Sequence, residues 1–154
     1  MKKVYRIMFV CLGNICRSPM AQMIFLSMVR AKGLSDSFII ESAGTSAEEL
    51  GNPIYPPARR ELSRRGVPFT DRGAVKLDAK DYGKYDLFVG MDSRNVRNMR
   101  NIFGGDPDGK IVKLLDYTDS HTDVADPWCT GDFSLAYSDI ERGCRALLDH
   151  LIHS

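Results

Sequence analysis

Residues 4–22 read VYRIMFVCLGNICRSPMAQ, and this stretch decides the expected fold. It opens with an apolar, partly β-branched run that is typical of a buried strand. Ser18 and Pro19 then form a start signal for a helix, with the serine at the cap and the proline at the first helical position. The stretch therefore predicts a strand and a helix that are joined by a short loop.

The rest of the chain repeats this alternation. Further strands are predicted at residues 38–40, 87–89 and 111–114, and further helices at residues 58–65, 93–103 and 133–152. Strands that alternate with helices indicate a parallel sheet that is covered on both faces. We therefore expect the α/β class, as a three-layer α/β/α fold with a central four-stranded parallel sheet.

Length and composition suit one domain that spans residues 1–154. Hydrophobic residues make up 44% of the chain, which is enough for a full core. The net charge of +1 gives no overall field that would favour nucleic acid or an anionic membrane. No stretch approaches the roughly 18 apolar residues that a membrane helix needs. The sequence predicts a cytoplasmic monomer or weak dimer with neither a nucleic-acid nor a membrane partner.

The cysteines are expected to be free or catalytic thiols, because the chain does not resemble a small secreted disulfide scaffold. Four residues separate Cys11 from Cys16, and the three histidines lack a spacing that would complete a zinc site. We therefore expect no metal and no cofactor. Cys129 and Cys144 are expected to be structural.

The loop between Cys11 and Arg17 has enough backbone to wrap around one tetrahedral anion. Its N–H groups, together with a helix N-terminus, can bind phosphate without a metal. Gly13 and Asn14 tolerate the left-handed conformations that a tight cradle needs. Arg17 can hold two phosphate oxygens in a bidentate fork. The predicted phosphate-binding residues are Leu12, Gly13, Asn14, Ile15, Cys16 and Ser18.

The positive field that attracts phosphate also favours the thiolate form of Cys11. Cys11 ends the first predicted strand, and parallel sheets bind ligands beyond the carboxyl ends of their strands. Ser18 can donate a hydrogen bond to the sulfur when the sulfur becomes a leaving group, beside its role as a helix cap. These residues predict nucleophilic attack by Cys11 on a bound phosphate.

The run VCLGNICRSPMA at residues 10–21 closely resembles the low-molecular-weight protein tyrosine phosphatase family. Other blocks that resemble the family are SAGT at 42–45, GNP at 51–53, Met91-Asp92 with Asn95, and Asp126-Pro127. The resemblance implies a hydrolase, a cysteine-dependent protein phosphatase that acts on phosphotyrosine in proteins or peptides.

The resemblance also selects the general acid and base. Spacing alone does not single out one of the 20 acidic residues, and Asp126-Pro127 by itself indicates only a turn. The family carries its acid in an Asp-Pro motif, which implies that Asp126 protonates the leaving phenolate and later activates water. Trp128 would then stack on the substrate ring, with Ser42 and Asp92 as supporting residues.

Two positions depart from the family pattern. Glu48 stands where the family often has an aromatic pocket wall, and Tyr55 could replace that wall or belong to the core. Asp71 stands where the family often has a histidine, in a network that supports the phosphate loop. Asn14 and Ser42 match the rest of that network.

Two alternatives and one regulatory hypothesis stay open. A protein arginine phosphatase would have a similar loop but typically threonine in place of Ile15, whose apolar contact favours an aromatic ring. A non-enzymatic phosphoprotein-binding module or phosphocysteine carrier would have no use for the acid. Cys16 is the candidate redox partner, because a sulfenic acid at Cys11 could condense with its thiol.

Overall fold

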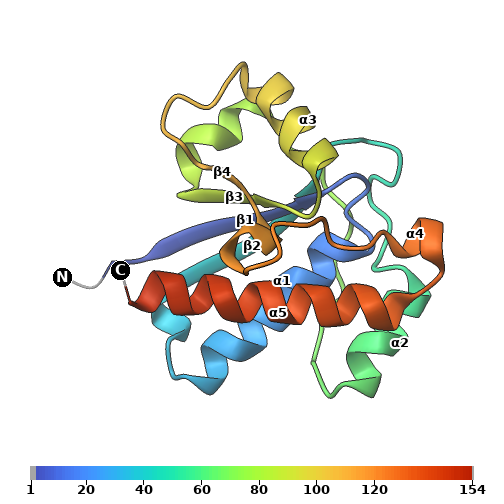
Figure 1. Ribbon diagram of the computed structural model, residues 1–154. Coiled ribbons are helices and arrows are strands. Elements are labelled where there is room, and N and C mark those ends of the chain that lie inside the picture. The colour runs from blue at the N-terminus through green and yellow to red at the C-terminus, as the bar shows by residue number, and fades with distance from the viewer. Residues whose placement is uncertain (1–2, 154) are drawn as a thin grey trace.

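The computed structural model describes residues 3–153 and has a four-stranded parallel sheet at its centre (Figure 1). The strands follow the order β2-β1-β3-β4 across the sheet. Their bounds are β1 Tyr5–Cys11, β2 Phe38–Gly44, β3 Leu87–Gly90 and β4 Ile111–Lys113. The predicted α/β fold class is confirmed.

Helices cover both faces of the sheet. Their bounds are α1 Arg17–Ala31, α2 Pro56–Arg64, α3 Ser93–Phe103, α4 Pro127–Thr130 and α5 Phe133–Ile152. In Figure 1, α3 lies above the sheet, and α1, α2 and α5 lie below it. Short 3-10 helices are found at Ser35–Ser37, Ala79–Lys84 and Leu114–Tyr117. No helix within residues 3–153 is long and apolar enough to cross a membrane.

The central strand β1 is buried on both faces because its side chains alternate between two apolar clusters. Ile7 and Phe9 pack in the cluster that contains α1 and α5. Met8 and Val10 pack in the cluster on the side of α3. A strand of this kind needs an unbroken apolar run, which is the pattern that the sequence shows.

The start of α1 differs from the prediction. The helix begins at Arg17, with Cys16 at the cap position, so Ser18 lies inside the first turn and does not cap the helix. The Ser18 hydroxyl instead lies 3.0 Å from the Cys11 sulfur. The helix ends at Ala31, shortly before Gly33, which has a φ of 69°.

The short helix α4 was not predicted. Asp126 caps it by accepting a hydrogen bond from the Trp128 N–H at 3.0 Å, and Pro127 occupies its first position. Proline is well suited to that position because its missing N–H has no partner there in any case. The Asp-Pro pair therefore starts a helical turn, which four residues are too few to reveal by periodicity.

Candidate active site

The site lies where the chain order across the sheet reverses. The chain runs from β1 to its neighbour β2 and later returns to β3 on the other side of β1. Ligands bind at such switch points, beyond the carboxyl ends of the strands. Cys11 ends β1, and Asp92 lies two residues beyond the end of β3 at Gly90.

The phosphate loop, defined as residues 11–18, is fixed by Asn14. Asn14 is 1% exposed and has a φ of 60°, so it takes the left-handed conformation expected for this loop. Its amide nitrogen donates to the hydroxyls of Ser18, at 2.8 Å, and Ser42, at 3.0 Å. Its side-chain oxygen accepts from the Val75 N–H at 3.0 Å. Asn14 and Ser42 thus support the loop from behind.

Among the described residues, several backbone carbonyls of the loop are hydrogen-bonded to other segments, whereas most of its N–H groups are not. The carbonyls of Cys11, Leu12 and Ile15 each accept a backbone N–H from a neighbouring segment, at 2.8–3.0 Å. The five N–H groups of residues 12–16 donate to no acceptor within residues 3–153. Such a cradle of uncommitted donors is suited to a tetrahedral anion.

Gly44 permits the close approach of β2 to this loop. A Cβ atom at Gly44 would lie 2.6 Å from the Leu12 carbonyl oxygen, which is closer than real Cβ atoms come. The register of the sheet pairs Gly44 with Cys11. A side chain there would push the loop away from the strand end.

Arg17 is oriented by two acceptors on different segments. Its Nη1 donates to the Val124 carbonyl at 3.0 Å, and its Nη2 donates to Asp92 Oδ2 at 2.9 Å. Arg17 is only 5% exposed, so this guanidinium is held rather than mobile. Asp92, which the resemblance implies as a supporting residue, thus lies against Arg17.

The predicted acid lies at the same pocket. Asp126 Oδ2 is 3.9 Å from Arg17 Nη2, and the Asp126 side chain is 42% exposed. The pocket has a volume of about 100 Å³. Its lining residues are Cys11, Leu12, Gly13, Ile15, Cys16, Arg17, Glu48, Glu49, Asp126 and Trp128. Residues predicted from distant parts of the sequence are thus brought together.

The aromatic wall is supported by a second ring. Trp128 is 61% exposed at the pocket, and the Tyr55 ring packs edge-on against it with centroids 4.7 Å apart. Tyr55 also contacts Phe133, at 6.0 Å between centroids. Tyr55 therefore stands behind Trp128 and does not replace the aromatic wall that is missing at Glu48.

The network behind the loop contains a residue that the sequence analysis missed. Arg72 Nη2 donates to the carbonyl oxygen of Asn14. No hydrogen bond or ion pair is formed by Asp71 among the residues that the structure describes. The supporting position therefore belongs to Arg72, one residue further along. The only signal for Arg72 in the sequence was that the preceding residue, Asp71, departs from the histidine that the family often has there.

The other thiols have different environments. Burial, together with the nearby charges of Cys11 and Asp126, raises the pKa of Cys16 to about 12. Burial also raises the pKa of Cys144, a core residue. Cys129 is exposed, with its sulfur 3.8 Å from Asp126 Oδ2. Among residues 3–153, no group of three or more His, Cys, Asp or Glu side chains could hold a metal.

Known proteins share both the sequence and the fold. The model of the family described as "Low molecular weight phosphotyrosine protein phosphatase" matches residues 6–154. The low molecular weight protein-tyrosine-phosphatase YfkJ of Bacillus subtilis is 37% identical over 144 residues, which are 92% of each chain.

Solved structures agree with this match. The crystal structure of YfkJ has a TM-score of 0.94 at 35% identity and covers 98% of this chain and 96% of its own. A Drosophila arginine phosphatase has a TM-score of 0.85 at 27% identity, with 94% and 96% covered. The chain therefore belongs to the low molecular weight phosphotyrosine protein phosphatase family.

Proposed function

We propose that this protein hydrolyses phosphotyrosine in proteins through a phosphocysteine at Cys11. One observation carries the proposal: a buried thiol, five uncommitted amides, an oriented Arg17 and the carboxylate of Asp126 meet at one pocket. We further propose that it acts in the cytoplasm as a single domain over residues 1–154.

In the first step, Arg17 and the loop amides hold the three equatorial oxygens of the phosphate. The Cys11 sulfur attacks phosphorus in line, the bond from phosphorus to the phenolic oxygen breaks, and Asp126 gives its proton to that oxygen. Donors that are already in place stabilise the charge of the transition state without reorganising. The orientation of Arg17 by Asp92 and Val124 supplies this preorganisation.

In the second step, the Asp126 carboxylate takes a proton from water, and the resulting hydroxide equivalent attacks the phosphocysteine. The bond from sulfur to phosphorus breaks, and Cys11 leaves as a thiolate. The Ser18 hydroxyl, 3.0 Å from the sulfur, can donate a hydrogen bond to the thiolate as it leaves. Ser18 in turn accepts from the Asn14 amide at 2.8 Å, and its only other acceptor within residues 3–153 is the Ala43 carbonyl at 3.5 Å, which is a longer contact than that to the sulfur.

The lining of the pocket supports an aromatic substrate. Ile15 is 8% exposed and presents an apolar side chain, and Trp128 offers a ring face or edge to a phenol. Glu48 and Glu49 line the same pocket. Part of the pocket lining therefore consists of carboxyl side chains, including Glu48 at the position where the family often has a ring.

Hydrolysis of phosphoarginine is the second candidate. Glu48 and Glu49 favour it, because carboxylates would attract the guanidinium part of that substrate. The structural similarity to an arginine phosphatase shows that this scaffold accommodates such a substrate in another protein. Ile15 and Trp128 favour phosphotyrosine.

The test is phosphate release from matched phosphotyrosine, phosphoarginine and phosphoserine peptides without added metal, with Cys11→Ser as the control. We expect release from phosphotyrosine that disappears in the variant. A preference for phosphoarginine would agree with the proposed mechanism but would contradict phosphotyrosine as the substrate. Absence of release from all three would support a binding module or carrier.

A further inference from the structure

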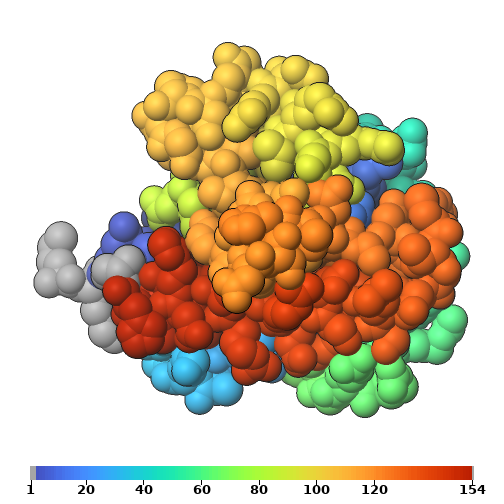
Figure 2. All heavy atoms as spheres, viewed as in Figure 1, coloured from blue at the N-terminus to red at the C-terminus, as the bar shows by residue number. Residues whose placement is uncertain are grey.

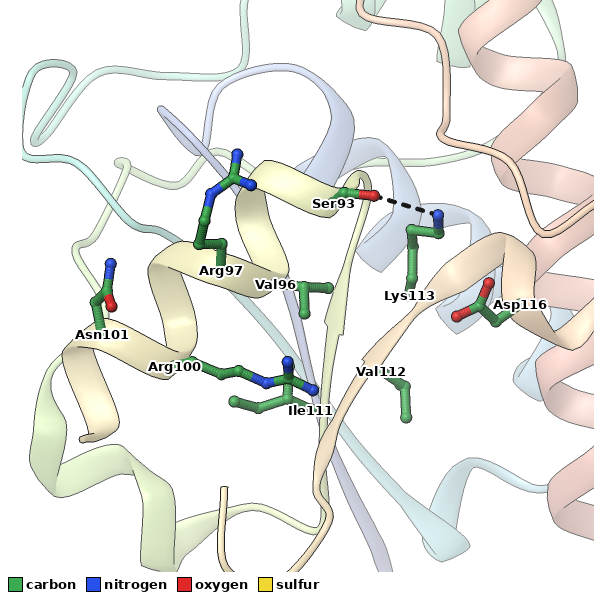
Figure 3. Close-up of a pocket in the computed structure, with 9 residues that line it drawn as sticks. All are labelled: Ser93, Val96, Arg97, Arg100, Asn101, Ile111, Val112, Lys113 and Asp116. Carbon is green, nitrogen blue, oxygen red and sulfur yellow. Dashed lines mark hydrogen bonds between the residues drawn. The ribbon is translucent and has the colours of Figure 1, made fainter. Parts of the chain in front are cut away.

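A second hollow lies beside the edge strand of the sheet. The groove between α3 and β4 has a volume of about 530 Å³ (Figure 3). Val96 of α3 and the strand residues Ile111 and Val112 give it an apolar lining. Figure 3 shows Arg97 and Arg100 on the α3 side of this groove. In the space-filling view, the yellow atoms of α3 stand above the orange segment that follows β4 (Figure 2).

The cations of α3 have no partners. Arg94, Arg97 and Arg100 recur every third residue, and the helix contains no acidic residue. None of the three guanidinium groups forms a hydrogen bond or an ion pair within residues 3–153. Only a longer-range attraction links Arg100 to Asp106.

Several arginines on or next to other helices are paired with carboxylates. On α5, Arg142 pairs with Asp139 and Arg145 pairs with Glu141, each within 4 Å. Glu61 of α2 lies 2.9 Å from Arg65, the residue that follows the helix. Pairs of this kind at a spacing of three or four residues are the usual arrangement on an exposed helix. Within residues 3–153, Arg30 of α1 and Arg59 and Arg60 of α2 are also unpaired, so α3 is distinguished by three unpaired arginines in a row at a spacing of three residues.

The groove and the active site are connected through residues that are adjacent in the sequence. Ser93 lines the groove, and the preceding residue, Asp92, pairs with Arg17 at 2.9 Å. The Ser93 N–H donates to Asp123, and the next residue, Val124, accepts from Arg17. One end of the groove therefore adjoins the segments that hold Arg17.

We propose that the α3–β4 groove docks an acidic segment of the phosphoprotein substrate, separate from the phosphorylated residue itself. This inference rests on the proposed function. Acidic side chains of the substrate would pair with Arg97 and Arg100. The aliphatic parts of these acidic side chains would cover Val96 and Val112. Asp116 is the one carboxylate among the lining residues, and it lies 3.5 Å from His121. Charge complementarity of this kind mainly raises the rate of association and lowers KM.

The experiment compares two phosphotyrosine peptides, one with a run of glutamates at increasing distance from the phosphotyrosine and one with glutamines instead. The enzyme is the full chain, as wild type and as the double variant Arg97→Glu/Arg100→Glu. We expect the double variant to raise KM for the glutamate peptide by about tenfold, because each exposed charge pair contributes modestly. The kcat for that peptide, and KM for the glutamine peptide, should remain within about twofold of wild type.

Two controls separate the possible results. Arg30→Glu/Lys32→Glu makes the same change in net charge at the far end of α1 and should leave both KM values unchanged. High salt should remove the wild-type preference for the glutamate peptide, since exposed charges are screened. Equal KM values for the two peptides in the wild type would overturn the docking proposal, as would an equal effect of the control variant. Turnover of a small aryl phosphate by every variant tests the proposed function independently.

Discussion

The phosphate loop at residues 11–18 and the acid segment at residues 126–129 face the same pocket, but they are held in different ways. Asn14 and Arg17 of the phosphate loop are 1% and 5% exposed, and both are hydrogen-bonded to distant segments. In the acid segment, Asp126 and Trp128 are substantially exposed.

This difference separates two tasks. A buried network gives a fixed cradle for an anion that is the same in every substrate, and any change in it also affects the stability of the fold. An exposed segment contacts the variable part of the substrate, so its side chains can change with little effect on folding.

The largest effect is expected for Asp126→Asn. Turnover of a phosphotyrosine peptide should fall by about 10²–10⁴-fold, because the leaving phenolate loses its proton donor. Asparagine caps a helix as well as aspartate does, so the free energy of unfolding should change by less than about 0.5 kcal/mol. Steady-state kinetics and urea denaturation measure the two quantities. Unchanged turnover would remove Asp126 from the mechanism.

Arg17→Lys should lower kcat/KM by about 10²–10³-fold. An ammonium group cannot reproduce the fork that reaches the phosphate, the Val124 carbonyl and Asp92 together. Arg142→Lys, on the surface of α5, is the matched control and should retain full activity. Circular dichroism would show whether Arg17→Lys is folded. If the variant is unfolded, its loss of activity is no evidence for a role of Arg17 in catalysis.

Asn14→Ala should affect stability as well as activity. It leaves the Val75 N–H without its acceptor, which costs about 1–3 kcal/mol. The left-handed backbone adds about 1 kcal/mol, because alanine does not favour a φ of 60°. Urea denaturation of this variant and of Asn101→Ala, on the exposed face of α3, makes the comparison. Equal stability of the two variants would show that the phosphate loop is not tied to the core as described.

Trp128→Leu should raise KM for a phosphotyrosine peptide by about fivefold, since aromatic pairs contribute about 0.5–1.5 kcal/mol. Its effect on the free energy of unfolding should be small because the side chain is 61% exposed. A phosphoserine peptide offers no ring and should respond less. An equal rise in KM for both peptides would indicate loss of the pocket shape instead of stacking.

The smallest effect is expected when the folded protein is treated with an alkylating reagent, because Cys16 should hardly react. With its pKa at about 12, Cys16 remains a thiol at neutral pH, so iodoacetamide should leave it unmodified in the folded protein. Reactivity should increase as the pH rises toward that value. Peptide mapping by mass spectrometry identifies the modified cysteines, and rapid alkylation of Cys16 at neutral pH would contradict the assigned environment.

The environment that raises the pKa of Cys16 also makes the redox hypothesis more specific. After mild peroxide, a sulfenic acid at Cys11 should condense with the Cys16 thiol to form a disulfide and release water. The high pKa of Cys16 predicts that disulfide formation accelerates with pH. Mass spectrometry should find a disulfide that thiols reverse. Accumulation of sulfinic acid at Cys11 without a disulfide would exclude Cys16 as its redox partner.

The sequence by itself determined the fold class and the position of the phosphate loop, and it predicted Cys11 as the nucleophile. These depend on local patterns: the apolar run of β1, the spacing from Cys11 to Arg17, and the helical periodicity of α3 and α5. Asp126 was a different case, because only the family resemblance distinguished it from the other acidic residues.

Only the tertiary structure decided which contacts distant side chains make at the site. Arg72 reaches the Asn14 carbonyl across 58 positions of sequence, and Asp92 reaches Arg17 across 75. The chain has many arginines and aspartates that are equivalent in sequence, and hydrogen bonding selects among them by distance and direction in space. Periodicity fixes the face of an element on which a residue lies, whereas the packing of elements fixes what that residue meets.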